Sequence, residues 1–500
     1  MTSVRVQDLR DRDLYSRLRR TLIVVLIAFF GAMLVRSGDG PNGFHKWRES
    51  DTAAIAANFY GESWDFLAPR VDQRGAGTGI TGMELPIYNY AVALVYLTNG
   101  GINHRAARLM TALGGVVALL GAWLCALRIL GSVQAAFATV VFVALSPLFF
   151  FYSRKIQPDV WALAFALLGL HLYMLSGLAE RGRWVLPAIG SGVLIALAGM
   201  IKPTFLCFGA PMLAWEWQRS SFRQLVSARN VVIAAVAIVP VFAWNHFAQG
   251  VNLREGVDFF TIALDLSASV TALQSRAFWQ NVFLTWLWEL QIGLPLAWIF
   301  MYGCYKLWQR AEFRILLPIV AWVFGALLIF ALVATHTATS HDYYTLPIIA
   351  PLAMITATGV VAALHNHRIW LRRAAVASCA MMLVYTPLRL KDRYGKPYDF
   401  YAGRALADHY LDEDALVVAY DNNPGTLLYR VGRKGWFEPN GSLSTGEEAA
   451  AARYLVTQAS MVGELSGAPL ARRLRERVYD DQGIVVFRFA GNPDDSSSSQ

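Results

Sequence analysis

Long apolar runs recur along the chain from residue 21 to about residue 388, and short polar connections separate them. A helix needs about 20 mostly apolar residues to cross a bilayer, and within lipid only helices and closed barrels satisfy every backbone polar group. The pattern therefore predicts an all-α polytopic membrane protein with about eleven transmembrane helices. The first run follows Arg17, Arg19 and Arg20 and is not followed by a small-residue cleavage site, so we expect it to be retained as a helix.

Positively charged residues set the expected topology. They fill the N-terminal arm, residues 1–20, and recur in the connections at Arg128, at Arg181 and Arg183, from Arg219 to Arg229, at Lys306, Arg310 and Arg314, and at His367 to Arg373. Since cytoplasmic loops carry an excess of Lys and Arg, we predict that the arm and these connections are cytoplasmic. Every second connection is then extracytoplasmic, namely residues 37–105, 153–159, about 202–204, 248–288, 336–344 and everything after about 389.

Residues 85–99 are apolar but short for a full crossing. Counting them as a span would place every later basic connection outside the cytoplasm. We therefore predict a juxtamembrane or re-entrant helix on the outer face. The N-terminus is then inside and the C-terminus outside.

The character of the chain changes after residue 389. Short strand-like runs, ALVVAYD, RYLVTQ and GIVVFRFAG, alternate with helical stretches. This alternation predicts a small extracytoplasmic α/β domain over residues 389–492, after a transmembrane domain over residues 21–388. The polar tail, residues 493–500, is predicted to be disordered.

The composition agrees with a membrane protein and narrows its partners. Hydrophobic residues make up 56% of the chain and charged residues only 16%, where soluble domains carry about 25% charged residues. The net charge of +9 comes largely from cations between apolar runs, where they act as topology signals, so we expect no nucleic-acid partner. The four cysteines lie inside apolar runs without a CxxC pair, which argues against a disulfide framework or a metal site.

The first outer connection carries residues suited to catalysis. Residues 45–86 hold Arg48, Asp51 and Glu84 among aromatic residues, and such a mixture is more typical of a site than of a simple connector. A carboxylate near the membrane surface could act as a general base for a hydroxyl. A structural alternative is that Ser50 or Asp51 caps a helix, and that the proline two residues after Glu84 marks another helix start.

Other outer connections carry unusual charges. Arg154 and Lys155 lie outside the membrane against the positive-inside tendency, which suggests that they bind a phosphate or an anionic headgroup. The alternative is a snorkelling pair at the interface.

Two further candidates lie later in the chain. Lys202 sits between two apolar runs on the predicted outer face, and the cluster His341, Asp342, Tyr343 and Tyr344 opens a late run. This cluster could orient a phosphate or a sugar, or it could belong to an interfacial aromatic belt.

Taken together, these motifs match a known family. The acid in RESDTAAIAANFY, the following ELP turn, the Pro-Asp after the third span and the late HDYYTLP resemble the GT-C superfamily of integral-membrane glycosyltransferases. The nearest branch is similar to the protein O-mannosyltransferase and lipid A aminoarabinose transferase group. The resemblance covers roughly residues 20–365 and leaves the tail domain undiagnosed.

The resemblance implies an activity and site roles. Such enzymes take a sugar from a polyprenyl-phosphate carrier and pass it, with inversion, to an extracytoplasmic glycan, lipid or protein acceptor. Asp51 matches the catalytic carboxylate of the family's first loop, Glu84 its second loop acid, and Asp159 the acid after the third span. Arg154 and Lys155 would face the lipid phosphate, and Arg48 lies beside the expected base.

One departure from the family concerns metal binding. Many members have two adjacent acids in the first loop, whereas here Ser50 separates Asp51 from Glu49. A single carboxylate is a poor site for a divalent cation. The sequence therefore gives no certain cofactor and leaves the need for a divalent metal open.

Two other functions remain as alternatives. A lipid or solute transporter would concentrate ionisable residues at mid-span and show paired, broken repeats, whereas here the acids fall in loops. A structural subunit that docks through its tail domain is the third possibility.

Short loops and basic arms suit a bacterial inner membrane, where membrane lipids surround the protein.

Overall fold

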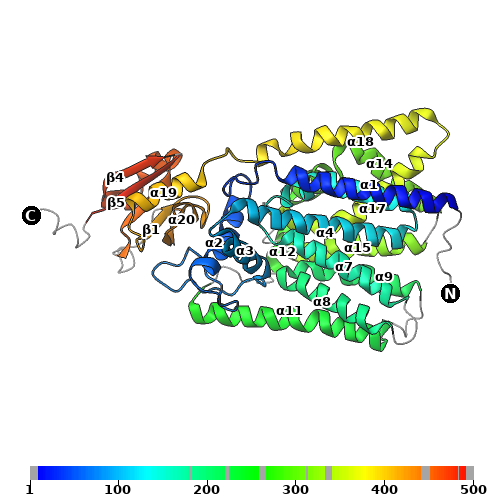
Figure 1. Cartoon of the computed structure of the whole chain (residues 1–500), viewed down its shortest axis with the longest axis horizontal. Coiled ribbons are helices and arrows are strands. Elements are labelled where there is room, and N and C mark those ends of the chain that lie inside the picture. The colour runs from blue at the N-terminus through cyan, green and yellow to red at the C-terminus, as the bar shows by residue number, and fades with distance from the viewer. Residues whose placement is uncertain are drawn as a thin grey trace, which may run out of the picture.

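The structure is a computed structural model that describes residues 9–178, 183–219, 225–257, 266–310, 313–332, 341–440, 451–481 and 483–490. The predicted disordered tail and the first eight residues of the basic arm lie outside these ranges. Figure 1 shows an elongated molecule in which a helical bundle carries a small α/β domain at one end, with the two chain termini at opposite ends.

In chain order, the helices of the bundle form an earlier set up to residue 255 and a later set from residue 266. The first contains α1 (Leu9–Met33), α4 (His104–Leu130), α5 (Val133–Leu145), α6 (Pro147–Tyr152), α7 (Asp159–Ser176), α8 (Val185–Ile201), η1 (Pro203–Phe208), α9 (Gly209–Trp217) and α11 (Ala228–Glu255). The second contains α12 (Leu266–Gln274), α13 (Arg276–Trp279), the π-helix η2 (Gln280–Ile292), η3 (Leu294–Leu296), α14 (Ala297–Arg310), α15 (Phe313–Leu332), η4 (Asp342–Ile348), α17 (Ile349–Leu364), α18 (Ile369–Leu390) and η5 (Lys391–Arg393).

Small residues let several of these helices approach closely. A Cβ added to Gly121 of α4 would press on Leu167 of α7, and one added to Gly169 of α7 would press on Ile195 of α8. In lipid, helices associate through close packing of this kind, because burial of apolar surface gives no advantage over contact with lipid tails. These glycines therefore help to fix the order of the helices in the bundle.

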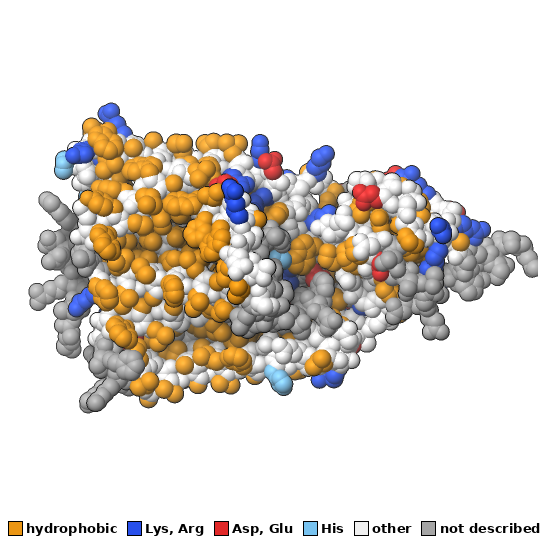
Figure 2. Space-filling model, turned by 180° about the vertical axis from the view of Figure 1, so that it is seen from behind, with side chains coloured by type: hydrophobic (Ala, Val, Ile, Leu, Met, Phe, Trp, Pro, Cys, Tyr) orange, Lys and Arg blue, Asp and Glu red, His pale blue; other side chains and the backbone are white. Residues whose placement is uncertain are grey.

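Five described helices are long and apolar enough to cross a membrane: His104–Leu130, Asp159–Ser176, Ala228–Glu255, Phe313–Leu332 and Asp342–Leu364. A sixth candidate is the pair Arg276–Ile292 and Leu294–Gln309, which is bent by 85°, and α5 and α8 are shorter apolar helices. Figure 2 shows hydrophobic side chains covering the flank of the bundle. The multi-pass helical architecture thus agrees with the prediction, while the number of about eleven spans stays a prediction.

The first predicted outer connection folds into two helices that lie together near the α/β domain (Figure 1). They are α2 (Lys46–Gly61) and α3 (Ile87–Asn99), and α3 occupies the short apolar segment. Their shared interface contains Ala53, Tyr88 and Val92, all buried. Both helices therefore belong to the end of the bundle that meets the C-terminal domain.

The C-terminal domain is the predicted α/β unit. Its described elements are α19 (Phe400–Tyr410), β1 (Leu416–Tyr420), α20 (Thr426–Val431), β2 (Lys434–Phe437), β3 (Tyr454–Gln458), η6 (Ala459–Met461), α22 (Val462–Leu465), η7 (Pro469–Arg473), β4 (Leu474–Asp481) and β5 (Ile484–Phe489). The strand order is β2-β1-β3-β5-β4, with β1 parallel to both neighbours and β5 antiparallel to β3 and β4. Alternate residues of β1 face opposite layers, so Val417 packs with Leu428 of α20 while Val418 packs with Leu465 of α22.

This domain is fastened to the first outer connection. The backbone N–H of Gly435 in β2 donates to the carbonyl of Asp72, and its own carbonyl accepts from Arg74 and Gly75. The Lys434 ammonium pairs with the buried Asp72 carboxylate. The two segments, far apart in the sequence, thus form one unit at this end of the bundle.

Candidate functional site

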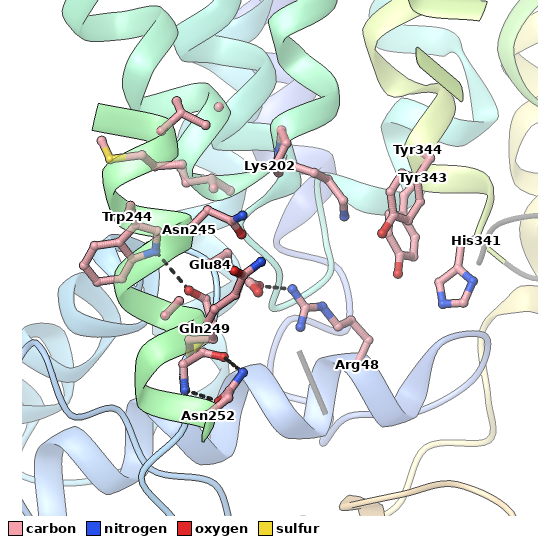
Figure 3. Close-up of a pocket in the computed structure, with 18 of the residues that line it drawn as sticks. Arg48, Glu84, Lys202, Trp244, Asn245, Gln249, Asn252, His341, Tyr343 and Tyr344 are labelled. Atoms are coloured by element: carbon pink, nitrogen blue, oxygen red, sulfur yellow. Dashed lines mark hydrogen bonds and ion pairs between the residues drawn. The ribbon is translucent and has the colours of Figure 1, made fainter. Parts of the chain in front are cut away.

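A cavity of about 620 Å³ lies where the bundle meets the C-terminal domain. Its walls come from the start of α2, the segment before α3, the end of α8, α11, residues 341–344 and the turn after β1. Figure 3 shows the side chains of Arg48, Lys202, Asn245 and Gln249 gathered around this space from α2, the residue after α8, and α11. Elements from distant parts of the chain therefore meet at one place.

Arg48 and Glu84 form an ion pair on the cavity wall (Figure 3). Arg48 lies in the first turn of α2, which begins at Lys46, and Glu84 comes directly before Leu85, whose N–H donates to the carbonyl of Met200 at 3.0 Å. The two side chains are 9% and 14% exposed, so the pair is largely shielded but still reaches the cavity. Arg48 and Glu84, two of the predicted site residues, are thus brought together.

Lys202 and Asp159 form a second pair. Lys202 ends α8 and Asp159 begins α7, and the Nζ lies 2.5 Å from Oδ1 of Asp159. The ammonium also lies 4.0 Å from the ring centre of Tyr343 and 4.4 Å from that of Tyr344. Burial lowers the pKa of Lys202 to about 8, although the Asp159 carboxylate opposes this shift.

The predicted late cluster divides between the cavity and the interior. His341, Tyr343 and Tyr344 line the cavity, and burial lowers the pKa of His341 to about 4, which leaves a neutral imidazole. Asp342 is fully buried behind them, where it accepts hydrogen bonds from Tyr152 and from Arg393, the latter at 2.6 Å. Asp342 therefore supports the segment and does not line this cavity.

Asp51 lies one turn beyond Arg48 on α2. Because α2 begins at Lys46 with His45 as its N-cap, Asp51 lies inside the helix, and the expectation that Ser50 or Asp51 caps a helix is wrong. Asp51 is 4% exposed and is not on the cavity wall. A Cβ built on Gly425 would lie 3.4 Å from its Oδ1, so the turn after β1 covers it.

The environment of Asp51 is unusual for a carboxylate. Its Oδ2 is buried and has no hydrogen-bond partner within the described part of the chain. Burial raises the pKa of Asp51 to about 7; the nearby Arg48 charge opposes the rise and Asp72 adds to it. Asp51 is therefore poised to gain or lose a proton near neutral pH.

Arg154 and Lys155 do not join Arg48 and Lys202. They line a separate, much smaller cavity of about 20 Å³. Lys155 is 2% exposed, and its Nζ donates to Glu49 at 2.9 Å and to the carbonyl of Asn42 at 2.6 Å. A snorkelling lysine would keep its ammonium in water, so that alternative is wrong for Lys155.

Glu49 is the centre of this second network, a role that no motif of the sequence indicates. Its carboxylate, fully buried, accepts from Arg108, from Lys155 and from the backbone N–H of Ile156, the last at 3.1 Å. Burial alone would raise its pKa, but the Arg108 and Lys155 charges hold the pKa of Glu49 below its usual value. Glu49 is thus a permanently charged anchor that joins α2 to α4 and to the segment before α7.

Two sets of cavity residues were missed. One is the polar side of α11, where Asn245, Gln249 and Asn252 line the cavity at spacings of four and three residues. That spacing places them on one helix face and could have been recognised in the sequence. The other is Asn422 and Asn423 in the turn after β1, and nothing local in the sequence links that turn to the membrane domain.

The described side chains that could coordinate a metal ion do not form a ready metal site. Within the described residues, no three His, Cys, Asp or Glu side chains gather closely enough to hold a metal ion. Of the candidate carboxylates, Glu84 is paired with Arg48, and Asp159 is paired with Lys202.

Comparison with known proteins gives one sequence match and several structural ones. The family model of dolichyl-phosphate-mannose-protein mannosyltransferases matches residues 84–244, a stretch that includes Glu84, Asp159 and Lys202. No curated protein sequence matches the chain significantly.

The solved structures that resemble the chain cover nearly all of it. ArnT from Cupriavidus metallidurans in the apo state is 15% identical, with a TM-score of 0.64 over 94% of this chain and 98% of its own. The same protein bound to undecaprenyl phosphate is 17% identical, with a TM-score of 0.64 over 93% of this chain and 97% of its own. AglB, an archaeal oligosaccharyltransferase from Archaeoglobus fulgidus in complex with an inhibitory peptide and a dolichol-phosphate, is 13% identical, with a TM-score of 0.58 over 94% of this chain and 74% of its own.

At these identities the likeness shows the fold. The chain has the fold of the GT-C glycosyltransferases, and the resemblance predicted from its motifs is confirmed.

Proposed function

We propose that this chain, which has the GT-C glycosyltransferase fold, moves a sugar from a polyprenyl-phosphate donor to an extracytoplasmic acceptor with inversion. The observation that carries the proposal is the cavity where the bundle meets the C-terminal domain, which combines two cations with aromatic and amide side chains. The similar structure of ArnT is bound to undecaprenyl phosphate and that of AglB is in complex with a dolichol-phosphate, which supports a lipid phosphate as the donor class.

Arg48 and Lys202 are the cations proposed to hold the donor phosphate. When the bond between the sugar and the phosphate breaks, its electron pair moves to a phosphate oxygen, and positive charge grows on the sugar ring. Cations held beside that oxygen in a partly dehydrated site stabilise the charge that develops in the transition state. Arg154 and Lys155, which we predicted for this role, line the smaller cavity. We therefore propose Lys155 as a support of α2 through Glu49, whereas the Arg154 guanidinium donates to the carbonyl of Val35.

A carboxylate beside Arg48 is proposed to accept the proton of the acceptor hydroxyl as its oxygen bonds to the sugar. Asp51 is our first candidate, because its pKa of about 7 suits proton uptake near neutral pH. It would have to become accessible through movement of the turn that covers it. Glu84 is the alternative, since it already lines the cavity.

The proposal can be tested with purified full-length protein and radiolabelled polyprenyl-phosphate sugars. Transfer of label to a membrane or glycan acceptor, with release of the lipid phosphate, is the expected result. Movement of the intact labelled lipid across a vesicle membrane without cleavage would favour the transporter alternative. Neither cleavage nor movement would leave the docking-subunit alternative.

We further propose that the protein resides in a bacterial inner membrane with its C-terminal domain on the extracytoplasmic side. The lipid-linked donor supports this location, because a long polyprenyl tail requires a site open to the bilayer.

A further inference from the structure

The turn after β1, residues 421–425, belongs to both the C-terminal domain and the cavity. Three of its residues, Asn422, Asn423 and Pro424, line the cavity. The turn leaves the carboxyl end of β1, which lies between two parallel partners, β2 and β3. In open α/β sheets, ligands characteristically bind in the crevice beyond the carboxyl ends of such strands, where successive strands are placed on opposite sides.

The turn is held in a defined position. Asp421 is fully buried, and its Oδ1 accepts from the N–H of Asn422 at 2.7 Å and from Nε2 of Gln458 at 2.6 Å. Gly425 has a φ of +71°, a left-handed conformation that favours glycine, and it lies against Asp51. In this structure the turn is therefore hydrogen-bonded to β3 on one side and lies in contact with α2 on the other.

Within the described part of the chain, the side-chain amides that this turn brings to the cavity have no hydrogen-bond partners. Neither the side chain of Asn422 nor that of Asn423 forms a hydrogen bond within the described ranges. Among those same ranges this also holds for Asn245 and Gln249 of α11, which Figure 3 shows pointing into the cavity. Asn252 differs, because its side-chain amide bonds the backbone of Gly82. Its Oδ1 accepts from the N–H of Gly82 at 2.6 Å, and its Nδ2 donates to the carbonyl of Gly82 at 3.0 Å.

We propose that residues 422 and 423, together with Asn245 and Gln249, form a recognition site for the hydroxyl groups of a sugar ring. An amide side chain offers two donors and an acceptor, which match a hydroxyl that both donates and accepts. The ring belongs either to the sugar on the lipid phosphate or to a glycan acceptor, and both present the same chemistry. This inference rests on the proposed function, and it gives the C-terminal domain a part in sugar selection.

Hydrogen exchange on the full-length protein tests the inference. The probes are farnesyl phosphate, farnesyl phosphate linked to mannose, glucose, galactose or arabinose, and methyl mannoside added with farnesyl phosphate. We expect at least one sugar-bearing probe to protect residues 421–425 more than farnesyl phosphate alone does. Protection by a farnesyl-linked sugar assigns the site to the donor, and protection by methyl mannoside assigns it to the acceptor.

Variants provide the second measurement. We expect Asn422→Ala with Asn423→Ala to weaken binding of the protecting probe about tenfold or more, and to leave binding of farnesyl phosphate unchanged. Asn440→Ala is the matched control, because Asn440 is an exposed asparagine of the same domain that does not line the cavity. Absence of sugar-dependent protection, or unchanged sugar binding in the double variant, would overturn the inference.

The same samples separate this inference from the proposed function. Sugar-dependent protection without cleavage of any labelled donor would support the recognition site and contradict glycosyl transfer. Cleavage without sugar-dependent protection would support glycosyl transfer and contradict the recognition site.

Discussion

Asp51 and Glu84 both lie near Arg48, but in different electrostatic states. Glu84 is ion-paired and reaches the cavity, whereas Asp51 is buried with an unpaired oxygen and a pKa of about 7. We predict that Asp51→Asn keeps donor binding but slows sugar transfer at least about a hundredfold, because an amide cannot accept the proton. Single-turnover assays with a labelled donor measure this. Near-normal turnover in Asp51→Asn together with an inactive Glu84→Gln would move the base to Glu84.

The same substitution has a consequence for stability that is independent of catalysis. The pKa of Asp51 is raised from 3.8 to about 7 on folding, so the folded protein binds a proton that the unfolded chain has released. Stability contributed by this group is therefore full below about pH 4 and is lost as the pH rises to about 7. We expect Asp51→Asn to melt higher than the wild type at pH 8 and to lose the advantage at pH 4. Thermal unfolding in detergent across this range measures it, and parallel melting profiles would contradict a raised pKa.

For Lys202 we predict a pH dependence of donor binding. Its pKa is lowered to about 8, so its charge is lost as the pH rises through that value. If the ammonium holds the donor phosphate, KM for the donor should rise about tenfold between pH 7 and pH 9. Lys202→Arg should remove this rise, and Lys202→Met should weaken donor use about 10- to 100-fold at pH 7, since a charge-assisted hydrogen bond contributes about 1.5–3 kcal/mol.

Lys306 offers a matched control for Lys202. Its ammonium also lies over two tyrosine rings, at 5.3 and 5.4 Å, but it does not line the cavity. Lys306→Met should leave donor kinetics unchanged. Equal effects of the two methionine variants would argue that a lysine over tyrosines stabilises the bundle and does not bind phosphate.

At the scale of elements, the contact between β2 and the first outer connection holds the turn over α2. Lys434 pairs with Asp72, which is 4% exposed on its side chain, and donates to Asn58 at 2.6 Å. We predict that Lys434→Met destabilises the docked domain by about 1–3 kcal/mol, because it leaves a buried carboxylate without its charged partner. Limited proteolysis of the linker after residue 389 should become faster. The double variant with Asp72→Asn should recover part of the loss, and purely additive effects would contradict a direct coupling.

The sequence predicts the secondary-structure elements better than the tertiary contacts between them. The apolar runs, the short helix α3 and the strands of the C-terminal domain follow from periodicity and length. The alternative that Ser50 or Asp51 caps α2 is wrong, because the helix begins earlier, at Lys46. Its N-cap is His45 in a left-handed conformation that few non-glycine residues adopt, so the sequence gives little sign of this start.

For the site too, the sequence indicates candidate residues but not which of them lie together. The predicted topology puts Arg154 and Lys155 on the same face as Lys202, but only tertiary packing decides which loops share a cavity. In the structure Lys155 bonds to Glu49, away from that cavity. The amides of the C-terminal turn join the cavity through contacts between distant segments, such as Lys434 with Asp72, 362 residues apart, and no local pattern encodes such a contact.

For the whole molecule, the cavity and the basic connections lie at opposite ends. The backbone N–H of His104, which begins α4, and its Nε2 contact Tyr401 and Tyr429 of the C-terminal domain. Arg128 follows 24 residues later in the same helix, about 36 Å away at 1.5 Å per residue. Likewise α11 carries Arg229 in its first turn and lines the cavity only with its second half, from Val241 onward.

This arrangement supports the predicted topology. Because basic connections face the cytoplasm, the cavity and the C-terminal domain should face the other side. Helix α1 begins at the end opposite the domain (Figure 1), and the arginines of its first half, such as Arg17, Arg19 and Arg20, therefore lie on the side predicted to be cytoplasmic. We predict that alkaline phosphatase fused at residue 400 is active in a bacterial host, whereas a reporter that works only in the cytoplasm is silent there. A fusion within the basic connection at residues 367–373 should give the reverse result. If the cytoplasmic reporter worked at residue 400, the cavity would open toward the cytoplasm, and the donor and acceptor would both have to be sought on that side.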